Sequence, residues 1–230
     1  HSAKYENEQD PANIRAAIQR YSIEHPVIVD RNMTIWNSFN VSAWPTLVLI
    51  GSDGRVIGSV SGEGHLDLLE NNIDRALAVG RKEGTLAAAP ITFAREGTVR
   101  AASGLSFPGK IIADAARRRL LIVDSNHNRL IITSWPTATD HVEVQTIIGS
   151  GKTGKEDGSF ADASFNRPQG ATFSPNGKVL YIADTENHLI RRADLEKKTV
   201  VTILGDGEQT FDPEAGKSGK DQGLNSPWDV

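Results

Sequence analysis

A repeat with a period of 60 residues constrains the second half of this chain more than any other feature. The apolar run Leu120–Val123 and the Asp124 that follows it recur as Leu180–Ala183 and Asp184, 60 positions later. A proline that precedes each unit recurs with spacings of 60 and 59 residues, at Pro108, Pro168 and Pro227. Because two independent landmarks share one period, the sequence predicts a repeat architecture.

Each repeat unit contains four strand-like runs separated by Gly, Asn, Asp and Pro. In the second unit the runs are Ala171–Ser174, Val179–Asp184, His188–Asp194 and Thr199–Leu204. Four short strands per unit are typical of a propeller blade, although the usual period is about 40–50 residues. We therefore expect long inserted loops at Gly149–Ser164 and Gly205–Gly223. Two blades cannot close a ring of roughly four to eight, so we expect a fragment of a longer protein with an incomplete propeller.

The first 80 residues show a different pattern, in which helical and strand-like periods alternate. Asp10 followed by Pro11 is a helix start signal. The expected elements are a helix of about three turns after Pro11, a strand at Pro26–Asp30, a helical turn at Thr34–Phe39, a strand at Thr46–Ile50 and a hairpin strand at Arg55–Ser61. A second amphipathic helix is expected after Gly64, with one face formed by Leu66, Leu69, Ile73, Ala76 and Leu77. We expect an α/β domain over residues 1–80, a linker over 81–104 and propeller blades over 105–230.

Composition excludes several classes of function. The chain has 25 Lys+Arg and 29 Asp+Glu, a net charge of −4, which disfavours nucleic acid as a partner. No apolar run approaches the roughly 18 residues that a membrane span needs. The chain contains no Cys, so it can form neither a disulfide nor a thiolate nucleophile.

Several motifs together resemble one known family. Val41–Ile50, which contains Trp44-Pro45-Thr46, is similar to the second half of a thioredoxin-like domain, where a cis-proline precedes the central hairpin. The run Asp184–Arg191 is similar to the motif that names NHL repeats. With Phe165–Gly170 and Leu224–Val230, the whole chain closely resembles the family of NHL-repeat-containing protein two and the plant suppressor-of-quenching proteins.

The resemblance implies a fold of class α/β plus all-β. Residues 1–80 would be the C-terminal part of a thioredoxin-like α/β domain, and 105–230 about two blades of an NHL-type β-propeller that has six blades in the family. It also implies a cytoplasmic or plastid-lumen location and a redox Cys pair upstream of His1. The chain departs from the repeat motif at Leu189, which replaces an arginine that Arg129 retains.

The best candidate for a binding site is Trp44-Pro45-Thr46. In thioredoxin-like folds this loop lies against the dithiol and exposes backbone groups to an extended substrate. The alternative is that a cis-proline only shapes the fold. We expect the Trp44–Pro45 bond to be cis, and we treat the three residues as a tentative substrate-binding loop.

The other candidates favour structural roles, and we assign no catalytic, cofactor-binding or metal-binding residue. Asp124 and Asp184 end matching strands, where a carboxylate can accept turn N–H groups. His127 and His188 lie one register apart in separate units, which disfavours a shared metal site. Gly149–Gly154 has the letters of a dinucleotide-binding loop but no helix after it. The arginine-rich segments are interpreted as solvated turns, at Arg117–Arg119 and Arg191–Arg192.

Two functions follow from these observations. The first is a protein-interaction scaffold without catalysis in this segment, in which a propeller face binds a protein partner. The second is part of a thiol–disulfide oxidoreductase whose Cys pair lies upstream and whose propeller recruits the substrate. A two-Cys motif in the preceding residues would favour the second function.

Overall fold

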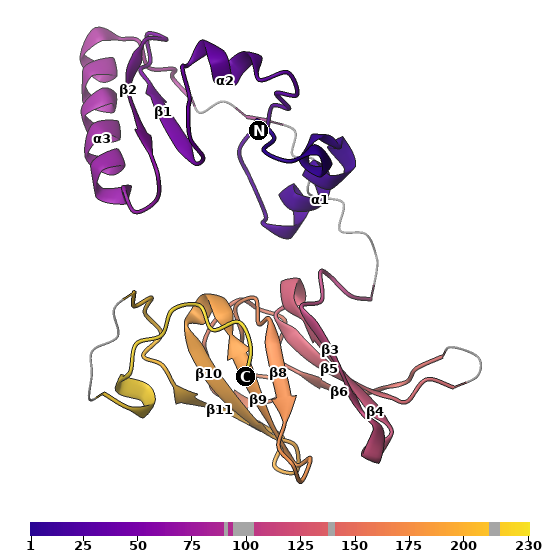
Figure 1. Ribbon diagram of the computed structural model, residues 1–230. Helices are drawn as coiled ribbons and strands as arrows, with labels where there is room; N and C mark the ends of the chain where they lie inside the picture. Colours follow the sequence, from indigo (N-terminus) through magenta and orange to yellow (C-terminus); the bar gives the residue numbers. More distant parts are fainter. Residues whose placement is uncertain (90–91, 94–103, 138–140, 212–216) are drawn as a thin grey trace. The chain divides into compact units, whose positions relative to one another are not determined.

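The chain divides into two compact units in a computed structural model, His1–Arg100 and Ala101–Val230. The structure describes residues 1–89, 92–93, 104–137, 141–211 and 217–230 (Figure 1). Within the described residues, no helix is both long enough and apolar enough to cross a membrane.

The first unit combines helices with one hairpin. Its elements are η1 (Glu6–Gln9), α1 (Pro11–Arg20), α2 (Thr34–Ser38), β1 (Thr46–Ile50), β2 (Val56–Ser61) and α3 (Leu66–Glu83). α1 begins where expected, because the Asp10 carboxylate accepts a hydrogen bond from the Ala12 N–H at 2.8 Å and Pro11 occupies the first helical position. The predicted strand at Pro26–Asp30 is wrong, since no described strand pairs with this segment.

The hairpin of β1 and β2 is antiparallel, with Leu47 opposite Val60 and Leu49 opposite Gly58. Its turn contains Gly54 at φ 82°, a conformation that favours glycine. α3 lies alongside the hairpin (Figure 1). The helix continues to Glu83, so its last residues lie within the predicted linker 81–104. Residues 90–91 and 94–103 of that linker are outside the described residues.

The second unit contains two antiparallel sheets of the expected kind. The first sheet has the order β3 (Lys110–Asp114), β4 (Arg119–Asp124), β5 (Arg129–Ser134) and β6 (Val144–Ile148). The second has the order β8 (Gly170–Phe173), β9 (Val179–Asp184), β10 (Leu189–Asp194) and β11 (Thr199–Leu204). The inserted loop adds the two-residue strand β7 (Gly158–Ser159) to the free edge of β11. The described strands form three antiparallel sheets in all, and none of them closes into a barrel.

The main hydrophobic core lies between these two sheets, which pack against each other in Figure 1. Leu121, Val123 and Leu130 from the first sheet join Leu180 and Ile182 from the second, and all five are fully buried. Each such side chain contributes about 1.5–3 kcal/mol to the free energy of folding through its burial. The two repeats therefore stabilise each other through one shared core.

A short turn with a left-handed residue connects the middle strands of each sheet. The 3-10 helix η4 (Ser125–His127) is followed by Asn128 at φ 50°, and η5 (Thr185–Asn187) is followed by His188 at φ 55°. Asn and His are enriched among the residues that adopt this conformation. The turns place the motif residues of both repeats at the same end of their sheets.

Candidate functional site

The loop Trp44-Pro45-Thr46 connects α2 to β1, and its Trp44–Pro45 bond is cis, as predicted. The Trp44 indole is 45% exposed. Its ring lies against Trp36, with centroids 4.2 Å apart, and its Nε1–H donates to the Ser2 carbonyl at 3.1 Å. Lys4 lies 6.0 Å from the ring centroid. The indole is thus anchored by Trp36 and Ser2 and remains partly exposed.

Asp30 positions the aromatic pair by capping α2. Its carboxylate accepts hydrogen bonds from the Ile35 N–H at 3.1 Å, the Trp36 N–H at 2.9 Å and the Ser2 hydroxyl at 2.9 Å. Burial opposes ionisation of this carboxyl, but these hydrogen bonds outweigh it and lower the pKa of Asp30. The charged carboxylate therefore fixes both the start of α2 and the place of Trp36.

Thr46 does not offer its hydroxyl to a ligand. Its Oγ1 donates to the Ala43 carbonyl at 2.8 Å and lies 2.7 Å from the Ser61 hydroxyl oxygen. The Pro45 carbonyl accepts from the Gly62 N–H at 3.0 Å. These groups hold the loop in place, while Trp44 and Pro45 both have exposed surface. The assignment of the trio to substrate binding stays a prediction.

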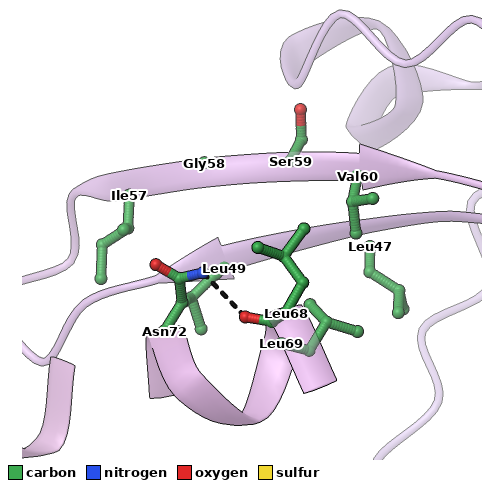
Figure 2. Close-up of a pocket in the computed structure, with 9 residues that line it drawn as sticks. All are labelled: Leu47, Leu49, Ile57, Gly58, Ser59, Val60, Leu68, Leu69 and Asn72. Carbon is green, nitrogen blue, oxygen red and sulfur yellow. Dashed lines mark hydrogen bonds between the residues drawn. The ribbon is translucent and has the colours of Figure 1, made fainter. Parts of the chain in front are cut away.

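An apolar pocket of about 120 Å³ lies between the hairpin and α3. Figure 2 shows aliphatic side chains of both elements around it, and its lining residues include Leu47, Leu49, Ile57, Val60, Leu68 and Leu69. The one amide in the lining, Asn72, already donates to the Leu68 carbonyl at 2.7 Å. The pocket can make apolar contacts, and none of its lining residues is ionisable.

The two repeat aspartates accept backbone N–H groups, but not those of the turn that follows them. Asp184 accepts from the Asn166 N–H at 2.8 Å, and Asp124 accepts from the Ser106 N–H at 2.6 Å. In both repeats the donor lies 18 residues earlier, in the connection that enters the sheet. The expectation of a turn cap is corrected on this point, because each carboxylate is fully buried and ties the incoming chain to its strand.

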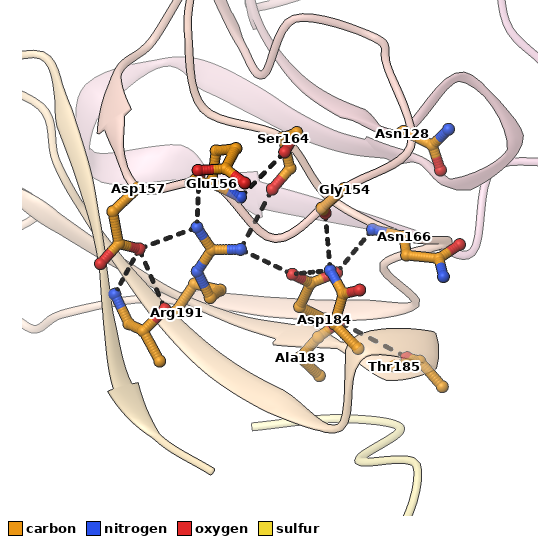
Figure 3. A network of polar contacts seen from close by, with 12 residues as sticks. Asn128, Gly154, Glu156, Asp157, Ser164, Asn166, Ala183, Asp184, Thr185 and Arg191 are labelled. Atoms are coloured by element: carbon orange, nitrogen blue, oxygen red, sulfur yellow. Dashed lines mark hydrogen bonds and ion pairs between the residues drawn. The ribbon is translucent and has the colours of Figure 1, made fainter. Parts of the chain in front are cut away.

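Arg191 is the central cation of the second repeat, and sequence reasoning missed its role. Its side chain is fully buried, although we expected a solvated turn residue. Nη1 donates to Asp184 at 2.8 Å and to the Ser164 carbonyl at 3.1 Å, while Nη2 donates to the Glu156 carbonyl at 2.8 Å and to Asp157 at 2.9 Å. Figure 3 shows the guanidinium between these partners. Arg191 therefore fastens the inserted loop to the sheet.

In the first repeat, the arginine that binds the repeat aspartate lies at a different strand position. Arg129 lies directly opposite Asp124 in the ladder and donates from Nε at 2.9 Å. Leu189 occupies the corresponding place opposite Asp184. Residues two apart on a strand share a face, so Arg191 can reach the aspartate from the next position on that face. The arginine that Leu189 replaces is thus supplied two residues later, and this pattern was visible in the sequence.

Burial dominates the electrostatics of Asp184. Removal from water raises the pKa of its carboxyl, and the hydrogen bonds from Asn166, Asn187 and Arg191 oppose that rise. At the exposed end of the network, the pKa of Asp157 is lowered, because hydrogen bonds from Thr202 and the charge of Arg191 exceed the effect of its partial burial. The guanidinium is thus shared by two carboxylates in different surroundings.

The two histidines make different contacts. His127 Nδ1 lies 2.8 Å from Asp124 Oδ2, whereas His188 Nδ1 accepts from the Ser226 N–H at 3.0 Å. Asp124 and His127 do not form a catalytic triad with Ser125, whose buried Oγ has no hydrogen-bond partner in the described part of the chain. Among the described residues, no three His, Asp or Glu side chains converge as a metal site would require.

The remaining motifs serve the fold. Gly149 has φ 105° and begins the inserted loop, in which no helix follows, so Gly149–Gly154 lacks the helix N-terminus of a dinucleotide site. Arg117 and Arg119 both pair with Asp114, at 3.4 and 2.9 Å. Arg119 also lies over the Phe173 ring, 4.2 Å from its centroid, so it packs between the sheets rather than in solvent.

Comparison with known proteins identifies the repeat that contains the Asp184 network. Residues 165–192 match the NHL repeat family. The chain is 41% identical over 230 residues to NHL repeat-containing protein 2 of Bos taurus, covering all of this chain and 31% of that protein. The chain is a homologue of NHL repeat-containing protein 2. This confirms the resemblance that the sequence motifs indicated.

The chain is also similar to a plant protein and to solved structures. It is 41% identical over 233 residues to Protein SUPPRESSOR OF QUENCHING 1, chloroplastic, of Arabidopsis thaliana, covering all of this chain and 22% of that protein. The chain thus spans about a third or less of the length of the curated relatives it matches. Among solved structures, it is similar to an auxiliary nutrient binding protein from Bacteroides thetaiotaomicron, with TM-score 0.42, 19% identity, 52% of this chain and 31% of that one.

Proposed function

We propose that this chain is part of a protein-interaction scaffold, and that the inserted loop Gly149–Ser164 of its NHL-type repeats contacts the partner. The observation that carries the proposal is the anchoring of this loop by Arg191, which binds the loop at Glu156, Asp157 and Ser164. A loop held in one conformation loses little conformational entropy when it binds a partner. Preorganised loops on a rigid frame are the usual form of a binding surface.

The outer side of the loop carries polar and charged residues suited to a protein partner. Lys152, Lys155 and Glu156 are exposed. The loop is joined to the first repeat as well, because the Asn128 amide donates to the Thr153 hydroxyl at 3.1 Å. The surface therefore combines exposed charged side chains with a backbone held by both repeats.

Site-specific photo-crosslinking tests the proposal. A photo-reactive residue at position 152 is expected to give a discrete adduct in extract, which excess unlabelled chain competes away and the variant Lys155→Glu weakens. A matched control carries the same residue at Lys178, which lies on the turn between β8 and β9 at the other end of the strands. Failure to obtain a competed adduct at position 152, or equal adducts at both positions, would contradict the proposal.

A second candidate is that the chain forms part of a thiol–disulfide oxidoreductase, with a thioredoxin-like first unit and the Cys pair upstream. The anchored and exposed Trp44 supports it, because a fixed aromatic surface suits contact with an extended polypeptide. On this proposal, Trp44, Pro45 and Thr46 bind the substrate beside a dithiol outside the chain. Thr46 would act through the loop, since its hydroxyl is already bonded.

The variant Trp44→Ala separates the two candidates. In the polypeptide that includes the preceding residues, loss of substrate binding with unchanged folding would support the oxidoreductase function. Unchanged turnover, or the lack of any Cys pair in those residues, would remove it.

A further inference from the structure

A side chain of each turn binds the backbone of the repeat that follows it. Asn128 Oδ1 accepts a hydrogen bond from the Arg167 N–H at 2.9 Å. One repeat later, His188 Nδ1 accepts from the Ser226 N–H at 3.0 Å. Arg167 and Ser226 are equivalent, because each precedes the proline of its repeat and each has a left-handed backbone, at φ 48° and 42°. The same contact therefore joins successive repeats twice in this chain.

The two acceptors differ in one chemical respect. An amide oxygen accepts a hydrogen bond at any pH, whereas an imidazole nitrogen accepts one only while it is unprotonated. Histidine is the side chain that ordinarily changes its charge between pH 5 and 8. The first junction is thus independent of pH, and the second depends on a neutral imidazole.

The charged groups near His188 lie on three elements. The charged groups on its own turn are Asp184, which is bound by Arg191, and Glu186, which is exposed. The strand end at Gly205 packs against the His188 backbone and continues to Asp206. The segment 224–230 carries Asp229, whose carboxylate is held by Lys110 at 2.5 Å. These groups are all acidic, and two of them, Asp184 and Asp229, are paired with cations.

A neighbouring contact keeps the junction assembled when the histidine bond is lost. The Thr185 hydroxyl donates to the Pro227 carbonyl at 2.8 Å, and this bond does not involve a titrating group. His127, in contrast, lies beside Asp124, so protonation of its ring retains a partner of opposite charge. Of the two histidines in the turns, His188 is the one that accepts a backbone N–H, and protonation of Nδ1 removes that bond while its 3.4 Å contact with the Ser226 hydroxyl oxygen can persist.

We propose that His188 is a pH-sensitive latch between the second repeat and the segment 224–230, which protonation of its imidazole opens. The released Ser226 N–H would then exchange with solvent, while the Asn128 junction stays closed. Acidification would in this way loosen one junction between repeats without unfolding the sheets.

Amide hydrogen exchange of the full 230-residue chain tests the latch. After correction for intrinsic rates, protection of the Ser226 amide is expected to fall roughly tenfold between pH 7.5 and 5.5, the size expected for loss of one hydrogen bond. Protection of the Arg167 amide, the matched control within the same molecule, is expected to stay constant.

Two reciprocal variants complete the test. His188→Asn introduces the residue that already occupies the left-handed position of the first turn, and it should make Ser226 protection independent of pH. Asn128→His should transfer the pH dependence to Arg167. If Ser226 and Arg167 respond alike in the unmodified chain, or if His188→Asn leaves the Ser226 response intact, the latch is refuted.

Discussion

Arg191 and Asp184 form a fully buried ion pair, with Nη1 and Oδ2 2.8 Å apart and both side chains without solvent exposure. Asp184 belongs to β9, and its partner lies on the adjacent strand β10 rather than in the turn between them. Nη1 and Nη2 of Arg191 also donate to the Ser164 and Glu156 carbonyls of the inserted loop. The buried Nε has no hydrogen-bond partner among the described residues. One guanidinium thus links a strand end, the neighbouring strand and the loop of the proposed binding surface.

Replacing Arg191 by Met should destabilise the second unit by about 3–5 kcal/mol, because it leaves a carboxylate buried without its countercharge. Urea denaturation monitored by circular dichroism measures the change. The control is Arg192→Met, since Arg192 is partly exposed and its bond to Asp194 is 3.2 Å long. That control should cost about 1 kcal/mol or less. Equal losses in the two variants would mean that the Arg191 network does not hold the fold.

Replacing Gly170 by Ala should also destabilise the second unit. Gly170 lies against Trp228 and Asp229, and the Asp229 carboxylate forms an ion pair with Lys110 at 2.5 Å. An added methyl group would clash with the Asp229 carboxylate and lie 2.6 Å from the Trp228 carbonyl oxygen. We expect a loss of about 1–3 kcal/mol, the usual cost of overpacking.

Gly58→Ala is the matched control for that change, because a methyl group there has no neighbour within 4 Å. Its expected effect on thermal unfolding is within about 0.5 kcal/mol of zero. A Gly170→Ala variant as stable as this control would show that the segment at Asp229 is free to move away.

The chain itself should not reduce disulfides. Attack on a disulfide requires a thiolate, and the sequence contains no Cys. In an insulin reduction assay with dithiothreitol, the rate should equal that of buffer with reductant alone. A rate above that of the heat-denatured chain would require a reducing group that the sequence does not contain.

The repeat architecture could be predicted from the sequence because its evidence is local and duplicated. Asp124 and Asp184 mark the same strand end twice, and the four strands of each unit follow from short β-rich runs between turn residues. The partners of these aspartates could not be predicted. Their backbone donors lie 18 residues away, and this pairing depends on how the connection folds back.

The role of Arg191 was hidden for a different reason. Arg191 and Arg192 are adjacent in the sequence, which suggests a pair of exposed charges. On a strand, however, neighbouring side chains point to opposite faces. The sequence signal was Leu189, where the first repeat has Arg129. An arginine missing from one position of a strand can be replaced by one two residues later, because both positions lie on the same face of the strand. At Pro26–Asp30 the sequence predicted a strand that does not form. A short apolar run becomes a strand only where another strand pairs with it, and no described strand does so here.

Asp114 should make the free energy of unfolding depend on pH in the acidic range. Burial opposes its ionisation, but the hydrogen bond and charge of Arg119, with the charge of Arg117, outweigh burial and lower the pKa of Asp114. In the unfolded chain an aspartate titrates near 3.9. The folded state therefore binds the proton less tightly than the unfolded state does. The stabilisation is fully present above about pH 4 and is lost as the pH falls through the lowered value.

The variant Asp114→Asn tests this dependence. At pH 7 it should be less stable than the unmodified chain by about 1 kcal/mol, since charged hydrogen bonds to Arg119 and Arg117 are lost. The difference should shrink as the pH is lowered from 5 to 2, because the unmodified carboxyl becomes neutral too. Urea denaturation at several pH values measures it, with Asp53→Asn as a control because Asp53 is more exposed and forms a longer contact of 3.7 Å with Arg55. A difference that stays constant down to pH 2 would show that the charge of Asp114 contributes nothing to the turn.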